Sequence, residues 1–171
     1  MIYYPICLDI KNKRCVIVGG GKVAFRKVES LLEAGAKVIV ISPGIIPSLK
    51  KLVDKNKITY LPQEYKFGDI KKGTFLVIAA SDDFQLNAKI ADEAKKLNLL
   101  INVADSPKLC NFILPATLRR GNLTISVSTS GKSPALAKKI KEDLQNVYGT
   151  EYEVLVDSLG KLRTKTQAIK K

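Results

Sequence analysis

The sequence predicts an α/β protein whose larger part is a Rossmann-like, doubly wound parallel sheet. Short apolar runs rich in β-branched residues alternate with segments of helical periodicity over the first 111 residues. A run of three glycines joins the first of these strands to the first helix. After residue 112 the alternation gives way to two adjacent strands and then amphipathic helices, which indicates a smaller α+β part.

The alternating pattern places each element of the larger part. We expect strands over residues 15–18, 37–41, 58–61, 75–80 and 99–103, and helices over residues 23–34, 47–55 and 84–97. Gly35 is a suitable helix stop, and Ser42-Pro43-Gly44 ends the second strand. Strand, glycine turn, helix and strand in this order form a βαβ unit, so we expect a parallel sheet with right-handed crossovers.

The smaller part begins with strands over residues 112–118 and 123–128, joined by Arg119-Arg120-Gly121-Asn122. Ser133 is a suitable N-cap, with Pro134 at the first position of a helix that reaches residue 147. Helical spacing returns over residues 152–162, and we expect the lysine-rich tail from Arg163 to fray. The chain is therefore divided at residues 1–111, 112–147 and 148–171, the last being a C-terminal helical segment.

A hairpin with one or two helices is too small to cover its own apolar faces. We therefore expect residues 112–147 to form a small α+β dimerisation domain that pairs with a second copy in a homodimer.

Composition narrows the class of function. Of the 171 residues, 46% are hydrophobic and 26% are charged, as in ordinary globular proteins. The formal net charge of +13 suggests a polyanionic partner: nucleic acid, an anionic membrane, or a ligand with several carboxylates or phosphates. The chain has no His, which excludes His-based zinc sites, Ser-His-Asp triads and imidazole bases.

The cysteines and the apolar runs indicate the cellular compartment of the protein. The chain has three cysteines, an odd number, and they form no CxxC pair: Cys7, Cys15 and Cys110. We therefore interpret them as small hydrophobic residues in a reducing cytosol and expect no metal site. No apolar run approaches the ~20 residues of a membrane span, and the first 13 residues do not read as a signal peptide. The expectation is a cytoplasmic protein that does not bind a membrane.

Gly19-Gly20-Gly21-Lys22-Val23-Ala24 matches the dinucleotide fingerprint G-x-G-x-x-G/A between a strand and a helix. In this pattern Gly19 allows the tight turn, Gly21 the approach of a pyrophosphate, and Ala24 close helix–sheet packing. The helix N-terminus supplies N–H donors to the phosphates. The alternative is a plain strand–helix turn.

The acid expected at the end of the second strand is replaced by Ser42. No carboxylate is there to bind a ribose diol and no Arg to bind a 2′-phosphate, so this position does not decide between NAD and NADP. Ser42 or the local backbone takes the place of that acid.

Two further strand ends carry polar groups. Small residues at Ala79 and Ala80 let a cofactor lie over the sheet, and Asp82 or Asp83 is suited to cap the next helix. Asp105 follows a buried strand at the same edge as the glycine turn. Because no imidazole exists, a carboxylate there is a natural proton acceptor, and the alternative is a turn before Pro107.

Basic residues and hydroxyls gather after the change of pattern. They comprise Lys108, Arg119, Arg120, Lys132, Lys138 and Lys139, with hydroxyls from Ser128 to Ser133 just before a helix N-terminus. Such a set suits an anion, although each lysine taken alone also suits a solvated surface.

Several motifs recur together in one known family. They are GGGxVAxRK at residues 19–27, AASDD at 79–83, NVxDxPK at 102–108 and SGKSP at 130–134. From about residue 3 to about residue 147 the chain resembles the precorrin-2 dehydrogenase/sirohydrochlorin ferrochelatase family, the dehydrogenase module of siroheme synthase. This resemblance implies NAD-dependent oxidation of precorrin-2 to sirohydrochlorin.

The resemblance also implies roles for individual residues. Gly19, Gly21, Lys22, Val23 and Ala24 match the cofactor loop, Pro43 and Gly44 match a second cofactor contact beside Ser42, and Ala79, Ser81 and Asn102 would face the cofactor. Asp105 matches the acid/base. The substrate is a polycarboxylate tetrapyrrole, which a +13 protein suits, with Lys108, Arg119, Arg120, Ser130, Lys132 and Ser133 as the residues that hold it.

Two features set the chain apart from the fused members of that family. The large methyltransferase module is absent, so we expect a stand-alone protein, and the short C-terminal part leaves metal insertion open. The rival hypotheses are a regulatory module that binds NAD without catalysis and a nucleic-acid binder. The second is disfavoured by the absence of Trp and the 6% aromatic content.

Overall fold

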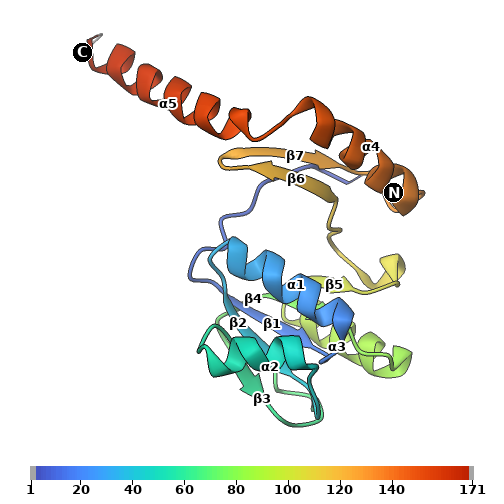
Figure 1. Ribbon diagram of the computed structural model, residues 1–171. Helices are drawn as coiled ribbons and strands as arrows, with labels where there is room; N and C mark the ends of the chain where they lie inside the picture. Colours follow the sequence, from blue (N-terminus) through green and yellow to red (C-terminus); the bar gives the residue numbers. More distant parts are fainter. Residues whose placement is uncertain (1–2, 170–171) are drawn as a thin grey trace. The chain divides into compact units, whose positions relative to one another are not determined.

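A computed structural model describes residues 3–169 and contains two compact units, one over residues 3–113 and one from residue 114 onward. The first unit holds a parallel sheet covered by helices on both faces, and the second holds a hairpin and two helices (Figure 1). The predicted α/β class and the doubly wound sheet are confirmed.

The first unit contains a five-stranded sheet in the order β3-β2-β1-β4-β5, with every pair of neighbours parallel. Its elements in chain order are β1 (Arg14–Val18), α1 (Lys22–Glu33), β2 (Lys37–Ile41), α2 (Pro47–Asp54), β3 (Thr59–Leu61), β4 (Thr74–Ala79), α3 (Phe84–Lys96), β5 (Leu100–Val103) and the short 3-10 turn η1 (Pro107–Leu109). These bounds lie within one residue of the predicted strands and helices.

The strand residues alternate between two cores, one on each face of the sheet. Cys15 and Ile17 of β1 face α1 and α2, where Val28 and Leu49 are fully buried. Val16 and Val18 face α3, where Ile90 is fully buried, in a second core. Because the central strands are buried on both faces, they are apolar without alternation, which is the pattern visible in the sequence.

The helix ends follow the predicted chemistry. Gly35 has φ +77 and lies just beyond α1, where its N–H donates to the Leu32 carbonyl oxygen at 2.9 Å. At the start of α3 the Asp83 carboxylate accepts from the N–H groups of Gln85 and Leu86 at 2.8 and 3.1 Å. Of the two acids expected as caps, Asp83 is therefore the one that caps α3.

The hairpin of the second unit begins later than predicted. Its strands are β6 (Ala116–Arg120) and β7 (Leu123–Val127), so the arginine pair belongs to β6 and the turn contains only Gly121 and Asn122. Residues 111–112 pair with the edge of β5 instead: the Asn111 amide accepts from the Ile101 N–H and donates to the Leu99 oxygen, both at 2.8 Å. The Asn111 side chain thus supplies β5, an edge strand, with hydrogen-bond partners that a neighbouring strand would otherwise provide.

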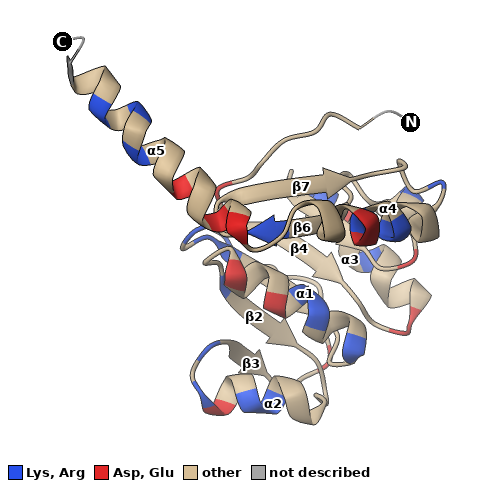
Figure 2. Cartoon of the chain, turned by 45° about the horizontal axis from the view of Figure 1, so that its top comes forward, with Lys and Arg blue, Asp and Glu red and all other residues tan. Residues whose placement is uncertain are grey.

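The second unit continues with α4 (Pro134–Val147) and α5 (Glu151–Ile169). Ser133 caps α4 by accepting from the Leu136 N–H at 3.3 Å, as predicted. The prediction that the tail frays from Arg163 is wrong, because α5 runs on to residue 169. No Gly or Pro ends it there, and acids lie in its first half and bases in its second half, which complements the helix dipole (Figure 2).

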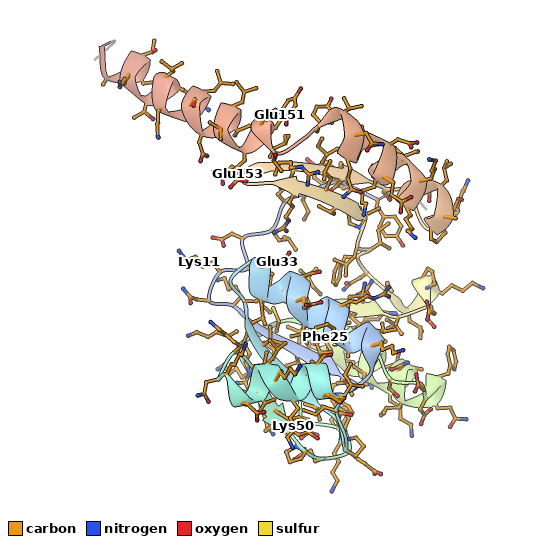
Figure 3. All side chains as sticks on the ribbon, viewed as in Figure 1. Lys11, Phe25, Glu33, Lys50, Glu151 and Glu153 are labelled. Atoms are coloured by element: carbon orange, nitrogen blue, oxygen red, sulfur yellow. The ribbon has the colours of Figure 1, made fainter. Side chains whose placement is uncertain are left out.

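The start of α5 packs against the hairpin turn within the second unit. A Cβ added at Gly121 would lie 2.5 Å from Cγ of Glu153, and the Asn122 amide donates to Asp157 at 2.9 Å. Figure 3 labels Glu151 and Glu153 at this end of the helix. Among residues 3–169, no helix is both long and apolar enough to cross a lipid bilayer.

The burial of the cysteines predicts their reactivity. Burial raises the pKa of the Cys15 thiol to about 11, whereas Cys7 is exposed. Because the thiolate is the nucleophile, native protein at pH 8 should react with a disulfide reagent at Cys7 alone, and all three cysteines should react in denaturant. The measurement is a timed thiol count. A Cys7→Ser variant that still shows a fast thiol would contradict this assignment.

Candidate active site

A hollow of about 850 Å³ lies in the first unit at the carboxyl ends of β1, β2 and β4. This edge is where doubly wound sheets bind ligands, and the volume is within the range of small-molecule sites. The lining residues come from the loops after β1, β2, β3 and β4, the ends of β1 and β2, and the first turns of α1 and α3: Val18 to Val23, Ile41 to Gly44, Glu64 and Tyr65, Ala80 to Asp83, and Leu86.

The first two glycines of the turn allow close backbone packing. Gly19 has φ +125, and a Cβ on it would collide with the backbone of Ala80 after β4. A Cβ on Gly20 would collide with the Gly44 carbonyl and lie 2.8 Å from the Ser42 hydroxyl after β2. The three loops around the hollow are thus held against one another at positions where only glycine fits.

The third glycine has a different environment. A Cβ added at Gly21 would meet nothing within 4 Å, although Gly21 lines the hollow and precedes the first turn of α1. The first intrahelical bond runs from Phe25 N–H to the Gly21 oxygen, so the amides of the first helical residues have no partner in the helix. No acid lies in this first turn, so the helix N-terminus suits an anion such as a pyrophosphate.

On the β2 side, Ser42 stands where dinucleotide-binding folds often have an acid. Its hydroxyl donates to the Gly44 oxygen at 2.7 Å, and the residue is buried. Having used its single hydrogen, the hydroxyl is left to accept, for example from a ribose hydroxyl. Pro43 and Gly44 are exposed and line the hollow.

Tyr65 and Glu64 line the hollow from the loop after β3 and were not singled out from the sequence. The Tyr65 hydroxyl donates to the buried Glu93 of α3 at 2.6 Å, and the same carboxylate accepts from Gly68 N–H at 3.0 Å. Burial raises the pKa of Tyr65, and the bond to Glu93 adds to this. The signal available in the sequence was their place after a strand at the ligand-binding edge.

Most of the residues predicted to bind a cofactor line the hollow. They are Gly19, Gly21, Lys22, Val23, Ser42, Pro43, Gly44 and Ser81. Ala24, Ala79 and Asn102 do not line it, because they are buried in the layers behind it. Ala24 lies in the core between α1 and the sheet, which is the packing position that the fingerprint assigns to it.

Asp105 lies just beyond β5 and is exposed. Its φ of +56 places it in the left-handed region, which Asp and Asn adopt more readily than other non-glycine residues, as Asn12, Asn56 and Asn98 also do in this chain. The preceding Ala104 donates its N–H to the Ala79 oxygen at 2.9 Å, which ties the loop to the end of β4. The loop thus shares the sheet edge on which the glycine turn lies.

A second charged group, Lys27 of α1, interacts electrostatically with Asp105. Lys27 lies on the helix face of Ala24, Val28 and Leu31, all three buried. Burial lowers the pKa of Lys27, Arg26 lowers it further, and Asp105 acts in the opposite direction. Asp105 and Lys27 are therefore electrostatic neighbours, a pairing that helical spacing alone did not reveal.

The residues predicted to hold a polyanion are divided between the two units. Lys108 lies on η1 in the first unit, and Arg119, Arg120, Ser130, Lys132 and Ser133 lie in the second. The Arg120 guanidinium donates to the Tyr148 oxygen at 3.0 Å and so links the hairpin to the end of α4. Arg119 and Lys132 are exposed, while Ser133 already caps α4.

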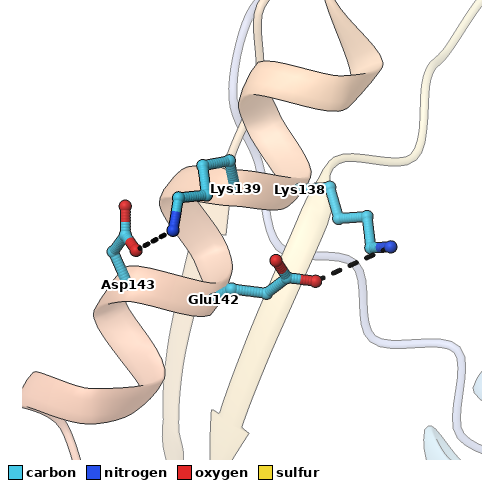
Figure 4. Close-up of polar contacts among 4 residues, drawn as sticks. All are labelled: Lys138, Lys139, Glu142 and Asp143. Atoms are coloured by element: carbon cyan, nitrogen blue, oxygen red, sulfur yellow. Dashed lines mark hydrogen bonds and ion pairs between the residues drawn. The ribbon is translucent and has the colours of Figure 1, made fainter.

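Two other lysines of the basic set are paired within their own helix. On α4, Lys139 contacts Asp143 at 2.8 Å and Lys138 contacts Glu142 at 3.7 Å (Figure 4). The hydrogen bond with Asp143 raises the pKa of Lys139. These i,i+4 pairs support the helix, so their lysines are less available to a ligand. Within residues 3–169 no three His, Cys, Asp or Glu side chains gather as a metal-binding group.

Family models match both units. A model described as putative NAD(P)-binding covers residues 6–116, and one described as the central part of sirohaem biosynthesis proteins covers residues 120–146.

Full-length relatives are similar over nearly the whole chain. The siroheme synthase of Vesicomyosocius okutanii is 37% identical over 98% of this chain, and that of Nitrosococcus oceani is 42% identical over 89%. The chain spans only 36% and 32% of those two proteins. Among solved structures, the precorrin-2 dehydrogenase SirC is 30% identical, with a TM-score of 0.81 over 95% of this chain and 79% of that chain.

The environments of the glycines predict opposite effects of substitution. Gly21→Asp points a charged side chain into open space, so the melting temperature should stay near that of the wild type while binding of NAD is lost. Gly19→Ala should instead cost about 2 kcal/mol or more of unfolding free energy, because of its positive φ and the contact with Ala80. Calorimetric titration with NAD and thermal melting test both. Unchanged NAD affinity in Gly21→Asp would move the site elsewhere.

Proposed function

This chain belongs to the precorrin-2 dehydrogenase family of NAD(P)-binding sirohaem biosynthesis proteins, and we propose that it catalyses the NAD-dependent oxidation of precorrin-2 to sirohydrochlorin. The observation that carries this proposal is that the exposed Asp105, just beyond β5, lies in a loop tied to the end of β4, at the sheet edge that also holds the glycine turn, although Asp105 is not among the residues that line the hollow itself. A dehydrogenase of this kind needs a dinucleotide site and a proton acceptor at one edge.

The chain's own residues fit a dinucleotide. Gly21 leaves open space before the free amides of α1, which suit a pyrophosphate, and the hollow extends to Ser42 and Tyr65 on one side and Ser81 on another. When bound, NAD supplies the acceptor for the hydride that leaves the substrate. The glycine loop would orient the dinucleotide, and the Ser42 hydroxyl would be free to accept a hydrogen bond from it.

Asp105 would take the proton that accompanies the hydride. The oxidation removes two electrons and two hydrogens from the substrate: one hydrogen leaves as hydride and the other as a proton to the carboxylate. The carboxylate is exposed, and therefore accessible to a substrate. Lys27 contributes a positive charge near the loop that carries this carboxylate.

Exposed basic residues of the second unit would bind carboxylates of the tetrapyrrole. Arg119 and Lys132 are exposed cations there, and Ser130 lies in a left-handed turn (φ +53) before the N-terminus of α4. The net charge of +13 adds a long-range attraction for such a substrate. We also propose a cytoplasmic location, because the three cysteines are unpaired.

Asp105→Asn tests the catalytic step. Asn tolerates the left-handed conformation at this position and keeps the size of the side chain, but it is no base. The turnover rate should fall about 10²–10⁴-fold while NAD affinity is retained. The assay follows NADH formation together with the absorption change of precorrin-2.

The same assay separates this proposal from its rival. Near-normal turnover in Asp105→Asn, at saturating NAD and precorrin-2, would remove Asp105 from catalysis. If the wild-type protein binds NAD but oxidises no precorrin-2, the rival interpretation as a regulatory NAD-binding module is favoured instead. Asp92→Asn is a matched control and should keep the wild-type turnover, because Asp92 is an exposed aspartate of α3 that does not line the hollow.

The second unit supports a homodimer. Large apolar side chains are exposed on both of its helices: Leu136, Ile140 and Val147 on α4, and Val154, Leu155, Leu159 and Leu162 on α5. A second copy of the chain would cover them.

Light scattering at micromolar concentration should therefore give twice the 18.8 kDa mass of one chain. Replacing Leu155 and Leu159 together by Glu should return the mass to one chain, because it places charge on the apolar face. Lys161→Glu on the same helix is the control and should leave the mass unchanged. A wild-type mass near 18.8 kDa would contradict the dimer.

A further inference from the structure

One buried sulfur atom contacts the loop around Asp105 at several points. The Cys110 thiol accepts from the Val103 N–H at 3.1 Å and from the Asn102 side-chain amide at 3.6 Å. Its own hydrogen is directed to the carbonyl oxygen of Val103 or of Ser106, each 3.4 Å away. These contacts are formed at a residue that is only 9% exposed, within the core on the α3 side of the sheet.

The contacted residues lie on both sides of Asp105. Val103 ends β5 two residues before it, Ser106 follows it directly, and Cys110 closes the loop after η1. The segment beyond is fixed to β5 as well, since the Asn111 N–H donates to the Ile101 oxygen at 3.1 Å and the Asn102 amide donates to the Phe112 oxygen at 3.2 Å. The loop thus leaves the strand and returns to it, and the sulfur joins its two ends.

This closure determines where the backbone of Asp105 runs. Asp adopts the left-handed region more readily than most residues, so the conformation itself needs no special contact, but the position of the loop does. The side chain of Asp105 makes no hydrogen bond among the described residues, so backbone contacts set that position. Before Asp105, the Ala104 N–H bonds to the Ala79 oxygen, and on either side the Val103 and Ser106 peptides contact the same thiol, which is the one side chain that joins the two ends of the loop.

We propose that Cys110 is a positioning residue: its thiol fixes the loop of residues 103–110 so that the Asp105 carboxylate is held at the sheet edge where the substrate reacts. The inference rests on the proposed role of Asp105 as the base. Sulfur suits this task, because it is large enough to reach several backbone groups at once and is easily buried among apolar side chains. Alanine at this position would leave the Val103 N–H buried without an acceptor.

The test compares three variants in the full-length protein. Cys110→Ala removes the acceptor, Cys110→Ser restores a smaller one, and Cys15→Ala is the matched control. Cys15 is buried like Cys110, but it lies near the amino end of β1, whereas the site lies at the carboxyl ends of the strands. Its sulfur makes no hydrogen bond among the described residues. A purely structural effect of losing a buried thiol should therefore be equal in the two alanine variants.

We expect Cys110→Ala to lower kcat about 10-fold to 100-fold, the size of effect produced by a displaced catalytic group, with the Kd for NAD unchanged. Cys110→Ser should recover most of this loss, and Cys15→Ala should keep the wild-type kcat even if it melts earlier. A kcat in Cys110→Ala within twofold of the wild type would overturn the proposal. So would a loss in Cys110→Ser as large as in Cys110→Ala.

A second measurement separates this inference from the proposed function. Hydrogen exchange of the Val103 and Ser106 amides, followed by NMR without substrate, should be at least tenfold faster in Cys110→Ala than in Cys110→Ser or Cys15→Ala. Equal exchange rates in all three variants would reject the role of Cys110 in fixing the loop, even if the protein is a dehydrogenase. If exchange is faster in Cys110→Ala but the wild-type protein oxidises no precorrin-2, the role of Cys110 stands and the proposed function is rejected. If Cys110→Ala does not fold, Cys110→Val, which fills the volume without an acceptor, replaces it in both measurements.

Discussion

The site depends on a close approach of three backbone segments at the end of β1. The Gly19 N–H donates to the Ile41 oxygen at 2.9 Å, and the Ile46 N–H donates to the Gly20 oxygen at 3.0 Å, so the glycine turn is joined to the loop after β2. On the other side Gly19 packs directly against Ala80 after β4. Side chains at these two positions would separate the loops, and with them the walls of the hollow and the start of α1.

The charges of the protein fall into distinct groups once the structure is known. Some lysines are satisfied locally, as Lys138 and Lys139 are on α4, and Arg120 holds the hairpin to the end of that helix. Others, such as Lys108, Arg119 and Lys132, are exposed without such partners among the described residues. Lys27 differs from both groups, because it is half-buried on an apolar helix face and is influenced by Asp105. Net charge thus indicated an anionic partner, but only position separates structural cations from those free to bind one.

The loops after the strands carry most of the special chemistry, and each is fixed differently. Glu93 holds the loop after β3 through Tyr65 and Gly68, Asp83 caps the helix after β4, and Cys110 closes the loop after β5. A carboxylate or a thiol thus supports the loops after β3, β4 and β5, whereas backbone bonds join the loops after β1 and β2. Sites on loops need such support, because a loop by itself does not hold a catalytic group in place.

The sequence by itself determined the order of strands and helices in the first unit, the glycine turn, the cap at Ser133 and the position of Asp105 after a buried strand. These features are local: apolar runs, helical spacing and turn residues act within a few positions, so they can be read along the chain. The start of β6 and the extent of α5 were predicted wrongly, because Asn111 pairs with β5 and because no stop signal ends α5 after Arg163. The tertiary structure alone brought Tyr65 to the hollow, Lys27 beside Asp105, and Cys110 to both sides of that residue. These are contacts between distant segments, and they are set by how the layers pack rather than by local preference.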